Sequence, residues 1–152
     1  MTVQMGTFER AEGGGLDAAL SAALYIPEER TTDAQALLST WTNRQDELVA
    51  PDLWAYEVVS IVYKCIRRGR LLEADASETL DRIMSLPIRL VRPSELHSRA
   101  MQLASALRLP APYDAHYLAL AEIEAAEFWT LDKTLYNTVH SHLAWVHLVG
   151  GL

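Results

Sequence analysis

The stretch "LVAPDLWAYEVVSIVYKCIRRG", residues 48–69, combines a short strand with the longest helix that the sequence predicts. Leu48 to Ala50 form a brief apolar run that Pro51 closes. A helix is expected from about Pro51 to Arg68, because proline suits a first helical turn and Gly69 suits the position after the last one. Apolar residues recur at helical spacing and define one broad face: Leu53, Trp54, Val58, Ile61, Val62 and Cys65.

Single short strands alternate with helices along the rest of the chain. Further strands are expected at 88–91, 127–131 and 143–149, and further helices at 16–27, 31–41, 73–86, 94–107, 112–126 and 133–139. This alternation is typical of a parallel sheet covered on both faces. The sequence therefore predicts one three-layer α/β domain at residues 16–152 with a central, mostly parallel sheet. Residues 1–15 are expected to form a Gly-rich leader.

The composition fits a globular protein and argues against several functional classes. Half of the 152 residues are hydrophobic and 22% are charged. Cys65 is the single cysteine, so an internal disulfide is excluded and a reducing cytoplasm is the expected location. No apolar run is long enough to span a bilayer. The net charge of −7 disfavours nucleic-acid binding through general surface electrostatics, so an RNA-binding role would need a local basic strip or a bound cation.

Four acids fall at or near the expected junctions between strands and helices, where parallel sheets bind ligands. They are Asp17, Glu57, Asp114 and Asp132. Taken singly, Asp17 and Asp114 fit helix-start acids that the helix dipole favours, and Asp132 fits a turn residue. Glu57 is different, because a carboxylate on the apolar face of the 51–68 helix must be paired, protonated or bound to a metal.

If the four carboxylates converge, a cation is needed to offset their mutual repulsion. Ligand sets made only of oxygen suit Mg²⁺ or Mn²⁺. Such an ion acidifies a water molecule and offsets charge on a phosphodiester. The chemistry that this pattern favours is hydrolysis of RNA or DNA.

Four segments resemble the motifs of PIN-domain ribonucleases, in the family's order. They are "LDAALSAALYIPEE", "LVAPDLWAYEVVSIVYKCIRRGRL", "YDAHYLALAE" and "FWTLDKTL", and the resemblance covers about residues 16–149. Within the family, the chain is most similar to VapC-type toxins of bacterial toxin–antitoxin pairs. The resemblance implies a PIN-like fold and an endoribonuclease that depends on Mg²⁺ or Mn²⁺.

The resemblance also implies roles for individual residues and partners. Asp17, Glu57, Asp114 and Asp132 would be the catalytic and metal-binding acids, and Thr130 would supply a supporting hydroxyl. A cognate antitoxin protein and a homodimer are implied in the same way.

The chain departs from the family around its first motif. Glycines 13–15 precede Asp17 where the family has an apolar strand, and glycines disfavour a central strand. Ala19 and Ser60 stand where hydroxyl or amide residues are common, so weaker hydrogen-bonding support and low activity are expected. Two alternatives follow: a catalytically weakened PIN-like binding module, and another α/β phosphate enzyme with an aspartate nucleophile.

The densest basic cluster is Lys64, Arg67, Arg68 and Arg70. Cations at a helix C-terminus complement the helix dipole, which is the favoured interpretation. A contact with RNA is compatible with it.

Overall fold

The computed structural model describes residues 13–151, in which five strands form one sheet in the order β3-β2-β1-β4-β5. The strands are β1 (Gly13–Leu16), β2 (Glu47–Ala50), β3 (Ile88–Leu90), β4 (Glu127–Thr130) and β5 (Val146–Leu148). All four pairings are parallel. The predicted parallel sheet is therefore confirmed, although the last strand is shorter than expected.

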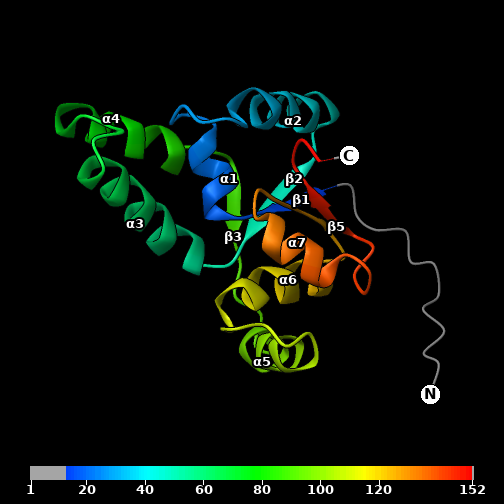
Figure 1. Cartoon of the computed structure of the whole chain (residues 1–152). Coiled ribbons are helices and arrows are strands. Elements are labelled where there is room, and N and C mark those ends of the chain that lie inside the picture. Colours follow the sequence, from blue (N-terminus) through cyan, green and yellow to red (C-terminus); the bar gives the residue numbers. More distant parts are fainter. Residues whose placement is uncertain (1–12, 152) are drawn as a thin grey trace, which may run out of the picture.

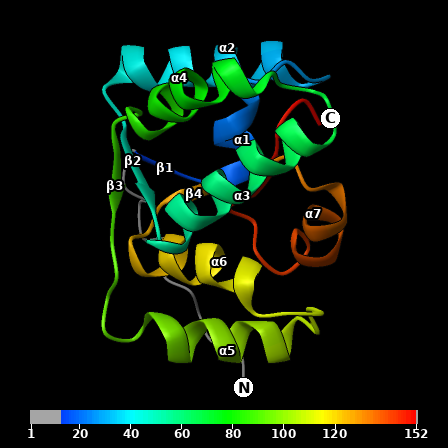
Figure 2. The ribbon, with the colours of Figure 1, turned by 90° about the vertical axis from the view of Figure 1, so that its left-hand side faces the viewer.

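Seven helices connect these strands in the described part of the chain. They are α1 (Ala18–Ala23), α2 (Thr31–Arg44), α3 (Leu53–Arg67), α4 (Glu73–Met84), α5 (Leu96–Ala106), α6 (Tyr113–Ile123) and α7 (Lys133–Val139). Figure 1 shows α2 on one side of the sheet and α6 on the other, with α5 packed beneath α6. Seen from the side, α3 and α4 form a helical pair that extends away from the sheet edge (Figures 1 and 2). The expected three-layer α/β architecture is confirmed.

The expectation that the glycines disfavour a central strand is wrong. Gly13 to Gly15 form most of β1, which lies in the middle of the sheet between β2 and β4. The expected boundary between leader and domain, after residue 15, therefore falls inside a strand. Residues 1–12 of the expected leader lie outside the described residues.

Close packing from both layers explains why this strand is built from glycine. A Cβ atom on Gly14 would lie 3.0 Å from the Trp41 indole of α2. On the opposite face, a Cβ on Gly15 would lie 3.3 Å from the Phe128 ring and 3.7 Å from the Ala121 Cβ of α6. Trp41 of the α2 layer and Phe128 of the neighbouring strand β4 thus fill the space that β-branched side chains would occupy. The entropic cost of glycine is offset by this tight three-layer packing.

The carboxyl ends of β1 and β4 flank the point where the chain changes direction across the sheet. From β1 the chain builds β2 and β3 on one side, and it later returns to build β4 and β5 on the other. Such a switch point is the usual ligand site of an open α/β sheet. No helix among residues 13–151 combines the length and apolar character that a membrane crossing requires.

We expect Gly14→Val to lower the free energy of unfolding by about 1–3 kcal/mol, because the added methyl groups overpack against Trp41. Replacing Trp41 with leucine should relieve this effect, so the loss caused by Gly14→Val should be smaller in a Trp41→Leu background. Urea unfolding of the four proteins measures the coupling.

Gly69→Ala is the matched control. Gly69 has a φ of +71° and no atom within 4 Å of an added Cβ, so its substitution costs backbone strain alone. The Trp41→Leu background should leave that cost unchanged. Equal losses for Gly14→Val in both backgrounds would contradict the packing explanation.

Candidate active site

The five predicted site residues gather at the carboxyl edge of the sheet. Asp17 directly follows β1, and Thr130 ends β4 two residues before Asp132. Glu57 lies in the second turn of α3, and Asp114 lies in the first turn of α6. Segments from four distant parts of the sequence thus bring these side chains to one end of the sheet.

The Asp17 carboxylate is fixed by two hydrogen bonds. The Thr130 hydroxyl donates to Asp17 Oδ2 at 2.6 Å, and the Leu20 backbone N–H donates to Oδ1 at 2.8 Å. Thr130 Oγ1 in turn accepts from the Asp132 N–H at 3.0 Å. Thr130 is fully buried. One buried hydroxyl therefore links the acid after β1 to the acid after β4.

The backbone of Asp17 is held by a second, buried chain of hydrogen bonds. Trp54 Nε1 of α3 donates to the Ser21 hydroxyl at 2.8 Å, and that hydroxyl donates to the Asp17 carbonyl at 2.9 Å. Both side chains are buried. This link ties α1 and α3 together beneath the site. The weaker hydrogen-bonding support expected from Ala19 and Ser60 stays a prediction, because this chain of hydrogen bonds holds the backbone of Asp17.

Glu57 finds its partner on another helix. The Tyr117 hydroxyl of α6 donates to Glu57 Oε1 at 2.6 Å. Burial, together with this hydrogen bond, raises the pKa of Tyr117 above its ordinary value, so the phenol remains a donor. The requirement that Glu57 be paired, protonated or metal-bound is therefore met by pairing with a phenol.

The acids act on one another electrostatically. Burial raises the pKa of Asp17 to about 6; the hydrogen bonds from Thr130 and Leu20 oppose this rise, and the charges of Asp114 and Glu57 add to it. These two carboxylates are therefore near enough to disfavour ionisation of Asp17.

Asp114 belongs to the same electrostatic cluster. Partial burial raises its pKa, and the charges of Asp132 and Glu57 raise it further. The charge of Asp114 raises the pKa of Asp17, and the charge of Asp132 raises the pKa of Asp114. Asp114 therefore couples electrostatically to the acids on both sides of the site.

Helix capping and membership of the acidic cluster occur in the same residues. Asp17 and Asp132 are the N-caps of α1 and α7, and Asp132 Oδ1 accepts from the Leu135 N–H at 3.0 Å. Asp114 is an acid in the first turn of α6. The helix-start interpretation of Asp17 and Asp114 is confirmed, whereas Asp132 is a helix N-cap and not only a turn residue. Neither role excludes a shared site, because these helices begin at the same edge of the sheet.

The chemistry of the donors fits a hard divalent cation, although their present spacing does not enclose one. As the side chains stand, residues 13–151 bring no three carboxylate, imidazole or thiol groups close enough to hold a metal ion. Burial is the main cause of the raised pKa values of Asp17 and Asp114, and the neighbouring carboxylates raise them further. The role of all four acids as metal ligands stays a prediction.

Three residues of the site were not singled out from the sequence for their roles there. Ser21, Trp54 and Tyr117 look like ordinary core residues in their own helices, and their partners lie 4 to 60 positions away in sequence. The sequence did offer one signal for Ser21, because a hydroxyl within the apolar run "AALSAAL" needs a hydrogen-bond partner when it is buried. Nothing local marks Tyr117 as the partner of Glu57.

Comparison with known proteins gives concordant results. The chain is 38% identical over 125 residues to Ribonuclease VapC3 of Pyrobaculum aerophilum, a match that covers 79% of this chain and 89% of that protein. No family model matches the chain.

Two solved structures share the fold at low sequence identity. The protein PAE2754 of Pyrobaculum aerophilum has a TM-score of 0.65 and 22% identity, and the match covers 92% of each chain. VapC20 of Mycobacterium tuberculosis, a toxin that cleaves the sarcin–ricin loop, has a TM-score of 0.57 and 16% identity over 84% of this chain and 95% of its own. These two structures support the fold alone, whereas the 38% identity to Ribonuclease VapC3 shows the family. The chain belongs to the VapC family of PIN-domain ribonucleases.

Proposed function

We propose that this chain is a metal-dependent endoribonuclease that hydrolyses RNA phosphodiester bonds as the toxin of a toxin–antitoxin pair. The observation that carries the proposal is the cluster of mutually repelling acids, Asp17, Glu57 and Asp114, at the switch point of the sheet. Perturbed carboxylates that converge from separate elements are typical of functional sites. Membership in a ribonuclease family selects RNA as the substrate.

Mg²⁺ or Mn²⁺, when bound, would acidify a water molecule and offset the negative charge that develops on the phosphodiester. Carboxylate oxygens of Asp17, Glu57, Asp114 and Asp132 would hold the ion. Thr130 keeps the Asp17 carboxylate oriented by donating to Oδ2. A protein with a net charge of −7 also needs this cation to admit an RNA phosphate among its acids.

We further propose that the protein forms a homodimer through an apolar surface on α3, α5 and α6. Tyr56, Val59 and Tyr63 of α3 are 75%, 49% and 61% exposed, and Met101 and Tyr113 are 67% and 63% exposed. Their spacing along α3 places the first three on one helical face.

The antitoxin and the cytoplasmic location rest on the family resemblance and the composition. A protein that blocks the RNA cleavage at equal stoichiometry would identify the antitoxin.

Sedimentation should give a species of twice the 17.0 kDa chain mass, because exposed aromatic side chains of this kind are favourable dimer contacts. Replacing Tyr56 and Tyr63 together with glutamate should yield the monomer. Glutamate at Leu72, which is also exposed but lies outside this surface, is the control and should leave the dimer intact. A wild-type monomer would overturn this part of the proposal.

Asp114→Asn should abolish metal-dependent RNA cleavage and raise the Tm of the metal-free protein at pH 8. Cleavage is lost because the variant lacks one carboxylate proposed to hold the ion, and the Tm rises because one charge that repels the other acids is removed. The pKa of Asp17 is raised from 3.8 to about 6, so ionising it destabilises the fold increasingly as pH rises through that window. The stabilisation by Asp114→Asn should therefore shrink at pH 5. Circular dichroism melts at both pH values measure it, in EDTA for the metal-free protein and, in separate samples without EDTA, with added Mn²⁺.

Asp75→Asn is the matched control, since Asp75 also lies in the first turn of a helix, α4. It should leave cleavage unchanged and lower the Tm slightly, because it removes a favourable helix-dipole interaction. If Asp114→Asn behaved like Asp75→Asn, Asp114 would be a helix-start acid and nothing more.

Tyr117→Phe should weaken Mn²⁺ binding on the order of 10-fold, because the phenol positions Glu57. Calorimetric titration gives the Kd for Mn²⁺, and a parallel melt shows whether the fold is intact. Tyr136→Phe is the control: its ring stacks on His140 of the α7 end, away from the Glu57 pairing. An unchanged Kd in Tyr117→Phe would remove Tyr117 from the site.

A further inference from the structure

A cleft of about 280 Å³ opens directly beside the acidic site. Asp132 lines it, together with three alanines of α1, Ala19, Ala22 and Ala23, and apolar side chains of α3. Ile26 and Leu131 add further apolar lining, and Glu28 and Arg70 are the other two charged lining residues. The cleft therefore has smooth apolar walls, a few polar groups and one of the proposed catalytic acids on its border.

The two charged groups lie on adjoining segments and are partly fixed. Arg70 Nη2 donates to the Pro27 carbonyl at 3.3 Å, which brings the guanidinium to the residue before Glu28. Glu28 accepts a hydrogen bond from the Arg30 backbone N–H through Oε1. The Arg70 guanidinium and the segment that carries Glu28 thus adjoin, and both residues line the same cleft.

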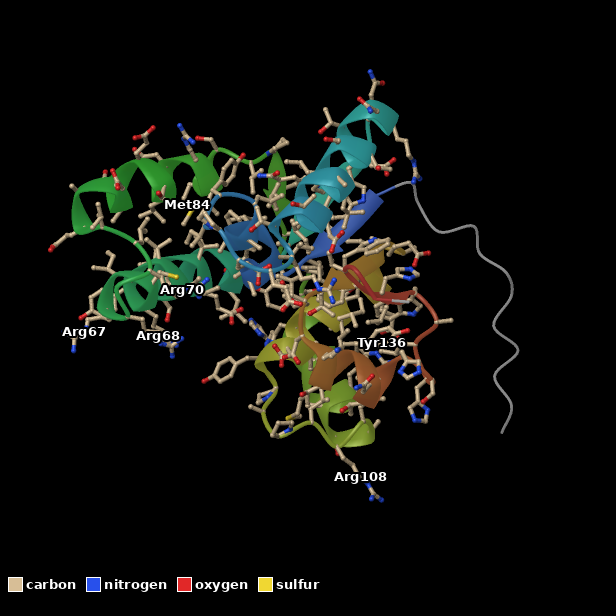
Figure 3. All side chains as sticks on the ribbon, turned by 45° about the horizontal axis from the view of Figure 1, so that its top comes forward. Arg67, Arg68, Arg70, Met84, Arg108 and Tyr136 are labelled. Atoms are coloured by element: carbon tan, nitrogen blue, oxygen red, sulfur yellow. The ribbon has the colours of Figure 1, made fainter. Side chains whose placement is uncertain are left out.

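Arg70 differs in this respect from the other members of the basic cluster. Arg67 lies in the last turn of α3 and Arg68 is its C-cap, as the helix-dipole interpretation expects. Neither lines the cleft. In Figure 3 the labelled Arg67 and Arg68 project outward, whereas Arg70 lies closer to α1. The cluster is therefore divided between helix-end cations and one arginine at the cleft.

The volume of the cleft suits a small group. At about 280 Å³ it lies at the lower end of the roughly 300–1,000 Å³ range of ligand pockets. Unstacked RNA bases are recognised in such places, with an apolar surface against the ring and polar groups at its edge. A nucleotide whose phosphate reaches the acids has its base within range of this cleft.

A guanidinium and a carboxylate that line one cleft select among the four bases. Guanine presents its O6 acceptor beside the N1–H and N2–H donors, so a donor and an acceptor at the same cleft satisfy both. Arginine is the common partner of guanine acceptors, and a carboxylate accepts from amino and imino donors. Uracil and cytosine present one donor position at this edge, and adenine has an amino group where guanine has O6.

We propose that this cleft binds the guanine base of a nucleotide next to the phosphodiester bond that is cut. Arg70 donates to O6, Glu28 accepts from N1–H and N2–H, and the alanines of α1 leave room for the ring. This inference rests on the proposed ribonuclease function and names a base preference for it.

Cleavage of a randomised single-stranded RNA pool with Mn²⁺, followed by sequencing of the products, tests the proposal. The wild-type protein should enrich guanine at one position flanking the cut. Glu28→Gln and Arg70→Met should each reduce that enrichment by about 10-fold. Both side chains are exposed, so the fold should survive, and a melt confirms it. Arg67→Met is the matched control and should lower cleavage of all sequences equally while keeping the guanine enrichment.

Filling the cleft gives an independent variant. Ala19 is exposed at its wall, so Ala19→Leu should exclude the base and remove the preference without disturbing the core. Cleavage without guanine enrichment, or enrichment that survives in Glu28→Gln, Arg70→Met and Ala19→Leu, overturns this inference and leaves the ribonuclease function standing. The cleft would then be better explained as a seat for a protein segment. RNA that stays intact with Mn²⁺ overturns both the inference and the proposed function.

Discussion

The hydrogen bond from the Thr130 hydroxyl to the Asp17 carboxylate is the interaction on which the site depends. It joins the ends of the two strands that flank the switch point, and the same oxygen accepts from the Asp132 N–H. The hydroxyl is fully buried, so neither partner is exchanged readily for water. The positions of two acids are therefore set by the register of β1 against β4, which pairs Leu16 with Trp129 and leaves Thr130 beside Asp17.

Two features of the core make that register possible. Glycines in β1 allow Trp41 of α2 and Phe128 of β4 to pack closely around the strand. The buried chain from Trp54 through Ser21 to the Asp17 carbonyl then anchors α1 and α3 to the strand end. Tight packing around β1 and the hydrogen bonds to the Asp17 carbonyl thus fix the backbone that carries the site residues.

The site itself opposes stability. Burial and neighbouring negative charge raise the pKa values of Asp17 and Asp114, so their ionised forms cost the folded state free energy. Proteins keep such arrangements where function requires them. In the proposed function these charges would attract a divalent cation, and the cleft beside Asp132 would take part of the substrate.

Sequence alone determined the order and type of the elements after β1, and the position of each acid at a helix start or on a helix face. These properties are local, because strand length, helical periodicity and capping act over a few residues. The interpretation of β1 failed because the partner that fills the space above Gly14 is Trp41, on a helix that local patterns do not place. Only the tertiary structure decided that Tyr117 pairs with Glu57 and that Thr130 bridges Asp17 and Asp132. It also decided that Arg70, unlike Arg67 and Arg68, lines a cleft. Each of these depends on contacts between segments far apart in the chain, whose geometry is set by how the layers pack and not by the residues beside them.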